Sequence, residues 1–313
     1  MNPQIRYEKR NKPIDNFITK YISNDSFNII NFLILIILIF IMINLILSLI
    51  KKKNIKVESC NQITVSRFSK LYTTLISLIL FTVFIYLDIV ESSKFWENCG
   101  PIVKISSTSN EPIREGYFLL RKWNAHTSLA LFSSGVFIIL KTYELNNLKY
   151  KFINGCLKHY ILGILLIFLG IASYGWWGSK RYVLWRADHA LMEGVNMYLT
   201  FVILSCSGIF KKCNEKKIMI LSLFIWFVRI FYMGQANLLL TISFCFISIP
   251  FTIIYAKSLG RVYLLKLGIL LTLLSIFFKI ADISNTLISG TGWFHIFISC
   301  GITSIWLWCL TVQ

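Results

Sequence analysis

The sequence predicts an all-α protein, a polytopic transmembrane helix bundle with about nine spans. Three observations predict this fold. Hydrophobic residues make up 56% of the 313 and charged residues only 15%, whereas a soluble domain carries about a quarter charged residues. Mean hydropathy is +0.66. The apolar residues also occur in runs long enough to cross a bilayer, which takes roughly 17–25 residues. Membrane lipids are therefore the expected surroundings of the chain.

Nine apolar segments are separated by polar or basic loops. The spans are expected at about Phe27–Ile50, Leu71–Val90, Trp123–Leu140, His159–Trp177, Ala187–Phe210, Ile218–Met233, Ala236–Ala256, Val262–Ala281 and Gly292–Val312. Only Gly234-Gln235 separates the sixth span from the seventh, so these two are the pair most easily miscounted. The pattern divides the chain into a polar tail (1–26), two extra spans with a loop (27–114) and a seven-span bundle (115–313).

The net charge of +18 comes from basic residues in the short loops between spans. Basic loops set the topology of membrane proteins, so nucleic-acid binding is not expected. The loops after spans one, three, five and seven are basic, which predicts that they are cytosolic. The N-terminus is then lumenal or extracellular and the C-terminus cytosolic. The basic loop at 178–187 departs from this pattern.

This orientation brings ionisable and polar residues from several spans to one membrane face. They are His126, Ser173, Asp188, His189, Asp282 and His295. Glu193 lies deeper in the fifth span. Ionisable groups in membrane segments are costly and usually face protein or water, so they indicate a functional site.

The stretch around the fourth and fifth spans contains the first of three motifs. Three residues separate Ser173 from Trp177, and Asp188 comes eleven residues after Trp177. These residues can also have purely structural roles. Ser173 can bond back to a carbonyl of its own helix, and Asp188 can pair with Arg186.

The second motif is Asp282 followed by GTGWFHIFISCG, in which Thr291 and His295 are four residues apart. The third is the run WNAHTS at 123–128. In this order the three motifs resemble the alkaline ceramidase family and its wider superfamily of seven-span membrane hydrolases. The resemblance covers about residues 115–313. It implies a lumenal N-terminus, a location in the endoplasmic reticulum or Golgi, and hydrolysis of the amide bond of a ceramide-type sphingolipid.

In that family three histidines hold a zinc ion. Catalytic zinc takes three protein ligands and one water, whose pKa falls to about 7. In this sequence Trp177 stands where the first histidine is expected and Thr291 where the second is expected. Only His295 remains. Ser173 and Asp188 would polarise the carbonyl or shuttle protons.

Three interpretations follow. In the first, His126 and His189 join His295 to rebuild a zinc site, with Asp188 or Asp282 orienting a ligand. In the second, the fold persists without hydrolysis, as a lipid-binding or scaffolding relative. In the third, the chain is a transporter or channel with a polar path. That path would use Asp188, Glu193, Arg229, Lys279 and Asp282. Structural roles also remain open, with His126 and His295 capping helix ends and Lys279 pairing with Asp282.

Overall fold

The computed structural model describes residues 67–103, 111, 113–147, 156–206, 208, 215–232, 247–254, 260–281 and 289–312. Within these ranges the chain is mostly helical, and its only extended pairings are two isolated bridges. The polar tail, the first expected span, most of the seventh and Asp282 lie outside the described residues.

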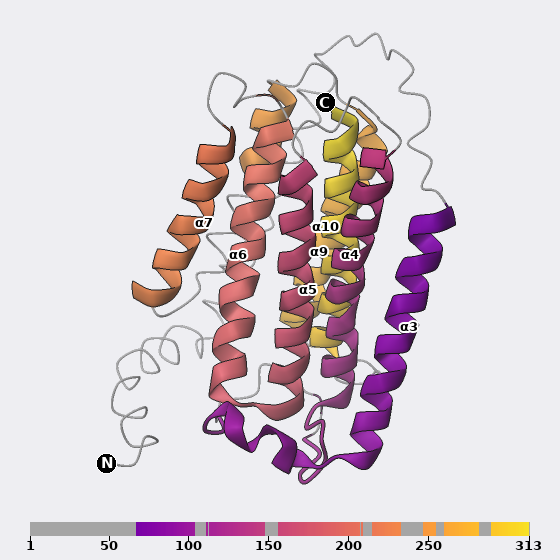
Figure 1. Ribbon diagram of the computed structural model, residues 1–313, viewed down its shortest axis with the longest axis vertical. Coiled ribbons are helices and arrows are strands. Elements are labelled where there is room, and N and C mark those ends of the chain that lie inside the picture. Colours follow the sequence, from indigo (N-terminus) through magenta and orange to yellow (C-terminus); the bar gives the residue numbers. More distant parts are fainter. Residues whose placement is uncertain are drawn as a thin grey trace. The chain divides into compact units, whose positions relative to one another are not determined.

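The described helices run as follows. They are α3 (Arg67–Val90), the 3-10 helix η1 (Ser93–Cys99), α4 (Lys122–Asn147), α5 (Cys156–Ser179), α6 (Tyr182–Cys206), α7 (Glu215–Tyr232), α9 (Val262–Ala281) and α10 (Gly290–Val312). Residues 247–254 are also helical. In Figure 1, α3 and α7 lie at opposite edges, with α4, α5, α6, α9 and α10 between them.

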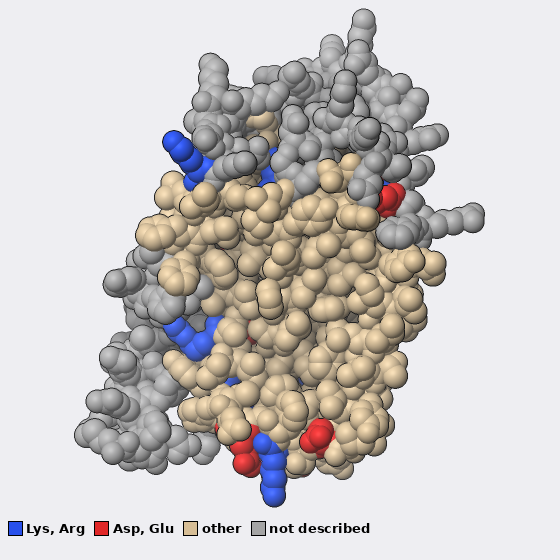
Figure 2. All heavy atoms as spheres, in the orientation of Figure 1, with Lys and Arg blue, Asp and Glu red and all other residues tan. Residues whose placement is uncertain are grey.

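Six of the described helices are long and apolar enough to cross a membrane, which is compatible with a multi-pass membrane protein. They are Ser69–Val90, Lys122–Asn146, Leu157–Ser179, Tyr182–Cys206, Val262–Ile280 and Gly290–Val312. The sixth expected span corresponds to a shorter apolar stretch, Lys217–Phe227 in α7. The described residues therefore contain six of the nine expected spans. On the face shown in Figure 2, the described charged side chains lie mainly towards the two ends, with uncharged residues over most of the middle.

Glycines allow α4 and α5 to pack closely. A Cβ added to Gly135 on α4 would lie 2.5 Å from the carbonyl oxygen of Gly163 on α5. Nearer the site, a Cβ on Gly170 would lie 2.6 Å from the backbone nitrogen of Phe132. Small residues at such contacts let helix backbones approach inside a membrane. The close packing of α4 on α5 fixes where the side chains at the ends of both helices meet.

The turn between α5 and α6 consists of only Lys180 and Arg181. The segment at 100–103 pairs with this turn, because the Val103 N–H donates to the Lys180 carbonyl (2.8 Å) and the Tyr182 N–H donates to the Pro101 carbonyl (2.9 Å). α6 thus begins five residues before the expected position at Ala187. Its first turns contain Arg186 and Asp188.

Glu111 holds the start of α4. Its two carboxylate oxygens accept the backbone N–H groups of Trp123 (2.6 Å) and Asn124 (2.8 Å). These donors belong to the first turn of a helix, where no intrahelical acceptor exists for them. Burial raises the pKa of the Glu111 carboxyl above its usual value, and the two N–H bonds partly oppose this rise. Glu111 therefore fixes the start of α4, the helix that contains Thr127 and His126.

Candidate functional site: a buried polar cluster

Four residues of the sequence motifs meet at one end of the helix bundle. The Ser173 hydroxyl on α5 lies 3.5 Å from Nε2 of His295 on α10. It is also a hydrogen-bond partner of the Asp188 carboxyl on α6. Nδ1 of His295 lies 3.3 Å from the Thr127 hydroxyl on α4. Ser173, Asp188 and His295 are all buried, so four helices enclose this chain of polar groups.

A lysine from a fifth helix completes the arrangement. Lys279 on α9 donates a 2.9 Å hydrogen bond to the Thr291 hydroxyl on α10. Its ammonium lies 5.2 Å from the ring centre of Trp177, within the range of a cation–π contact. It also interacts electrostatically with Asp188 and His295. The polar cluster is defined here as Thr127, Ser173, Trp177, Asp188, Lys279, Thr291 and His295.

Lys180 lies beside the polar cluster. Its ammonium is 3.5 Å from the ring centre of Trp177 and 4.1 Å from that of Trp176. Burial lowers the pKa of this lysine to about 6, and the nearby cations Arg121 and Lys279 lower it further. Two amino groups therefore flank Trp177, and that ring is 4% exposed.

Several buried polar atoms at this end have no hydrogen-bond partner within the part of the chain that the structure describes. They are Trp177 Nε1, the Tyr174 hydroxyl and both ring nitrogens of His126. A buried polar atom without a partner costs about 1–3 kcal/mol. Such atoms therefore mark places where a ligand or water would gain a hydrogen bond.

The other two candidate zinc ligands point elsewhere. His126 is buried in an aromatic group, with its ring centre 5.2 Å from Phe81 of α3 and 6.0 Å from Tyr174. His189 lies with Nδ1 3.0 Å from the Trp185 carbonyl of its own helix. His189 interacts electrostatically with the neighbouring Asp188, but neither His126 nor His189 has a recorded contact with His295. Glu193 is buried further along α6.

The residues around His295 do not fit a zinc ion. Across the described ranges, no group of three or more His, Cys, Asp or Glu side chains is placed to hold a metal. The groups recorded around the His295 ring are the Trp177 and Phe294 rings, the Thr127 and Ser173 hydroxyls, the Asn124 backbone and the Lys279 ammonium. A catalytic zinc takes three nitrogen, oxygen or sulfur ligands, and an ammonium repels a cation.

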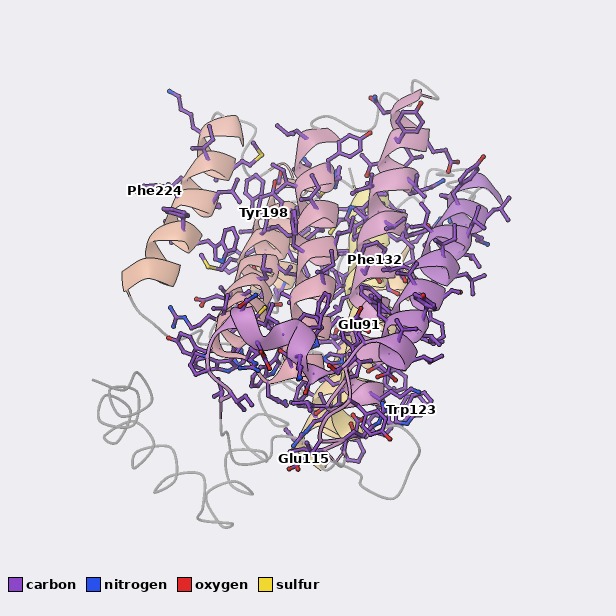
Figure 3. All side chains as sticks on the ribbon, turned by 60° about the horizontal axis from the view of Figure 1, so that its bottom comes forward. Glu91, Glu115, Trp123, Phe132, Tyr198 and Phe224 are labelled. Atoms are coloured by element: carbon purple, nitrogen blue, oxygen red, sulfur yellow. The ribbon has the colours of Figure 1, made fainter. Side chains whose placement is uncertain are left out.

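A cavity of about 470 Å³ opens beside Lys180. It lies between η1, the segments around 102–103 and 113–121, and the turn from α5 to α6. Figure 3 turns this end of the protein forward, and Glu115 and Trp123 are labelled there. Because Lys180 borders the cavity and also contacts Trp177, it connects the cavity with the polar cluster.

No family model, no curated protein and no solved structure matches this chain.

Lys180 and Lys279 are members of the site that the motifs did not identify. The sequence pattern indicates Lys279 only as a partner of Asp282 or as part of a transport path, and Lys180 only as a residue of the basic loop at 178–187. The sequence signal for both is a position near the end of an apolar span, with Lys180 three residues after Trp177 and Lys279 two residues before Ala281.

Proposed function

We propose that the chain is a non-hydrolytic, lipid-binding relative of the alkaline ceramidases. In this proposal the Lys279 ammonium takes the place of the metal ion. Its ligand is a ceramide-type lipid whose amide and hydroxyl groups reach the polar cluster.

The observation that carries the proposal is the position of Lys279. The resemblance expects zinc histidines at positions 177 and 291, and the lysine's ammonium contacts both residues that stand there instead. It hydrogen-bonds Thr291 and lies 5.2 Å from the Trp177 ring. A fixed positive charge can attract a carbonyl oxygen as a metal does. It supplies no metal-bound water, so it would bind an amide without a nucleophile to attack it.

The unpaired indole nitrogen supports the same ligand chemistry. Trp177 Nε1 is a buried donor without an acceptor among the described residues. An amide carbonyl oxygen placed between this N–H and the ammonium would satisfy the donor and complement the charge. The Ser173 hydroxyl, between Asp188 and His295, can exchange hydrogen bonds with a lipid hydroxyl or amide N–H.

The test is binding of a short-chain fluorescent ceramide to the full chain purified in neutral detergent. We expect saturable binding to the wild type and about tenfold weaker binding to Lys279→Met, because the charge opposite the carbonyl is lost. Trp177→Phe removes the indole donor and keeps a ring, so it should weaken binding to a smaller extent. Trp293→Phe, a half-buried tryptophan outside the polar cluster, is the matched control and should bind normally.

Two results would overturn the proposal. One is near-stoichiometric zinc in the freshly purified wild type, with ceramide hydrolysis that His295→Ala abolishes, which would instead establish the hydrolase. The other is absence of ceramide binding together with solute flux in proteoliposomes that Asp188→Asn blocks, which would establish the transporter. Location in the endoplasmic reticulum or Golgi, with a lumenal N-terminus, stays a prediction of the resemblance.

A further inference from the structure

The cavity beside the turn from α5 to α6 is strongly basic. Arg121, Lys180 and Arg181 border it, and Glu115 is the one acidic side chain on its wall within the described residues. Arg121 and Lys180 are buried, with exposed fractions of 5% and 9%. Buried cations are costly unless a counter-charge accompanies them. Glu111 interacts electrostatically with both Arg121 and Lys180, and Asp188 also interacts with Lys180.

Lys180 is held at the cavity by a conformation that most side chains avoid. Its φ angle is +54°, in the left-handed region where glycine is the usual residue. In that conformation a side chain's Cβ crowds the following carbonyl oxygen. The Lys180 N–H donates to the Trp176 carbonyl (2.8 Å), and its carbonyl accepts the Val103 N–H. The backbone strain at Lys180 is retained although a glycine at this position would relieve it. This indicates a role for the Lys180 side chain.

The remaining walls are mostly apolar. Trp96, Ile102, Ile113 and Leu120 also line the cavity. The cavity lies at the ends of α4, α5 and α6, where membrane helices meet the aqueous side. A basic cavity with apolar walls at the ends of membrane helices suits a ligand in which an anionic group is attached to an apolar or partly polar molecule.

We propose that this cavity binds a phosphate group among Arg121, Lys180 and Arg181, with the two guanidiniums supplying positive charge and the Lys180 amine taking up a proton when the anion binds. The phosphate belongs either to a lipid headgroup or to a free phosphate ester, since both present the same anionic oxygens. Arginine binds such oxygens through its planar set of donors and lysine as a point charge. The Arg181 Nη1 donates to the Gly100 carbonyl at 2.9 Å, which holds the guanidinium at the cavity edge. This inference goes beyond the proposed function, because a ceramide carries no phosphate.

The experiment measures thermal unfolding of the full chain in neutral detergent with three probes. These are inorganic phosphate, glycerol 3-phosphate and dioctanoyl phosphatidic acid. We expect at least one of them to raise the unfolding midpoint of the wild type in a saturable way, because a ligand that binds only the folded state stabilises it. A rise with phosphatidic acid alone identifies a lipid headgroup, and a rise with glycerol 3-phosphate as well identifies a free phosphate ester.

Lys180→Gly is the decisive variant. Glycine favours the left-handed conformation, so this change removes the ammonium while easing the backbone, and the fold should persist. We expect the apparent affinity for the active probe to fall about tenfold. Lys94→Gln removes an exposed lysine of η1 that does not line the cavity, and it should leave the affinity unchanged. Absence of stabilisation by all three probes, or equal affinities for the wild type and Lys180→Gly, would overturn the proposal.

Discussion

Lys279 Nζ lies 2.9 Å from the Thr291 hydroxyl and so connects α9 to α10 inside the polar cluster. The same ammonium lies 5.2 Å from the Trp177 ring on α5. Three helices therefore meet around one positive charge. Because the charge belongs to the chain itself, it does not depend on the supply of a metal ion, and it favours ligands with carbonyl or anionic oxygens.

The first prediction is a gain of zinc binding. The triple variant Trp177→His/Thr291→His/Lys279→Met removes the ammonium and provides two imidazoles near His295. We expect this variant to bind close to one zinc ion per chain, because three histidines and one open position form a common catalytic zinc site. The wild type should contain much less. Elemental analysis of the detergent-purified proteins measures the difference.

The control for this experiment adds His295→Ala to the triple variant. Two histidines alone hold zinc weakly, so the metal content should return towards that of the wild type. If the triple variant folds but stays free of zinc, positions 177, 291 and 295 do not face a common point. The assignment of Lys279 to the metal position would then be wrong.

The second prediction concerns the start of α4. Glu111→Ala removes the acceptor of two backbone N–H groups, those of Trp123 and Asn124. Loss of such a capping interaction costs about 0.5–2 kcal/mol in the free energy of unfolding. Unfolding by sodium dodecyl sulfate measures this change. Glu115→Ala is the control, since Glu115 lies nearby but does not bond these donors in the recorded interactions. Equal effects of both variants would contradict the capping role.

A third prediction tests the packing of α4 on α5. Gly135→Val introduces a branched side chain where even a Cβ would lie 2.5 Å from the Gly163 carbonyl oxygen. The helices must separate, so we expect a clear fall in the thermal unfolding midpoint, with a cost of about 1–3 kcal/mol or more. Gly175→Ala is the matched control. Its Cβ would meet only the flexible Leu184 side chain, at 3.0 Å, and this variant should stay close to wild type.

The sequence predicts the depth of the site residues better than the direction of their side chains. Hydropathy and loop charge place His126, His189 and His295 at one membrane face, and the motif spacing selects Ser173 and Asp188. Rotation of each helix about its axis depends on packing that no local pattern specifies. His126 lies against Phe81 and Tyr174 instead of joining His295.

Lys279 is a second residue whose side-chain direction the sequence does not predict. Its contacts with Thr291 and Trp177 depend on how α9 packs on α10. That packing involves Gly268 on α9 and Gly301 on α10, where an added Cβ at Gly301 would lie 2.7 Å from the Thr272 hydroxyl. A lysine near the end of an apolar helix ordinarily extends to the membrane surface. Only the assembled helices show that this one turns inward.

The last prediction follows from the low pKa of Lys180. Its pKa is about 6 in the folded protein and about 10.4 in an unfolded chain. Between these values the unfolded state binds one more proton than the folded state. The free energy of unfolding therefore rises with pH across this window. Arg121 and Lys279 favour the neutral amine, while Asp188 and Glu111 oppose them.

Lys180→Gly removes this titration and also the left-handed strain. We expect the variant to unfold at a higher temperature than the wild type at pH 6.5 to 7. The difference should shrink steadily towards pH 9, because folding of the wild type releases the Lys180 proton and this release costs less free energy as the pH rises. Lys94→Gln, an exposed lysine substitution, should show no such trend. A constant difference between wild type and Lys180→Gly from pH 6.5 to 9 would mean that Lys180 keeps its proton in the folded protein. The ammonium would then already have a compensating negative charge at the cavity.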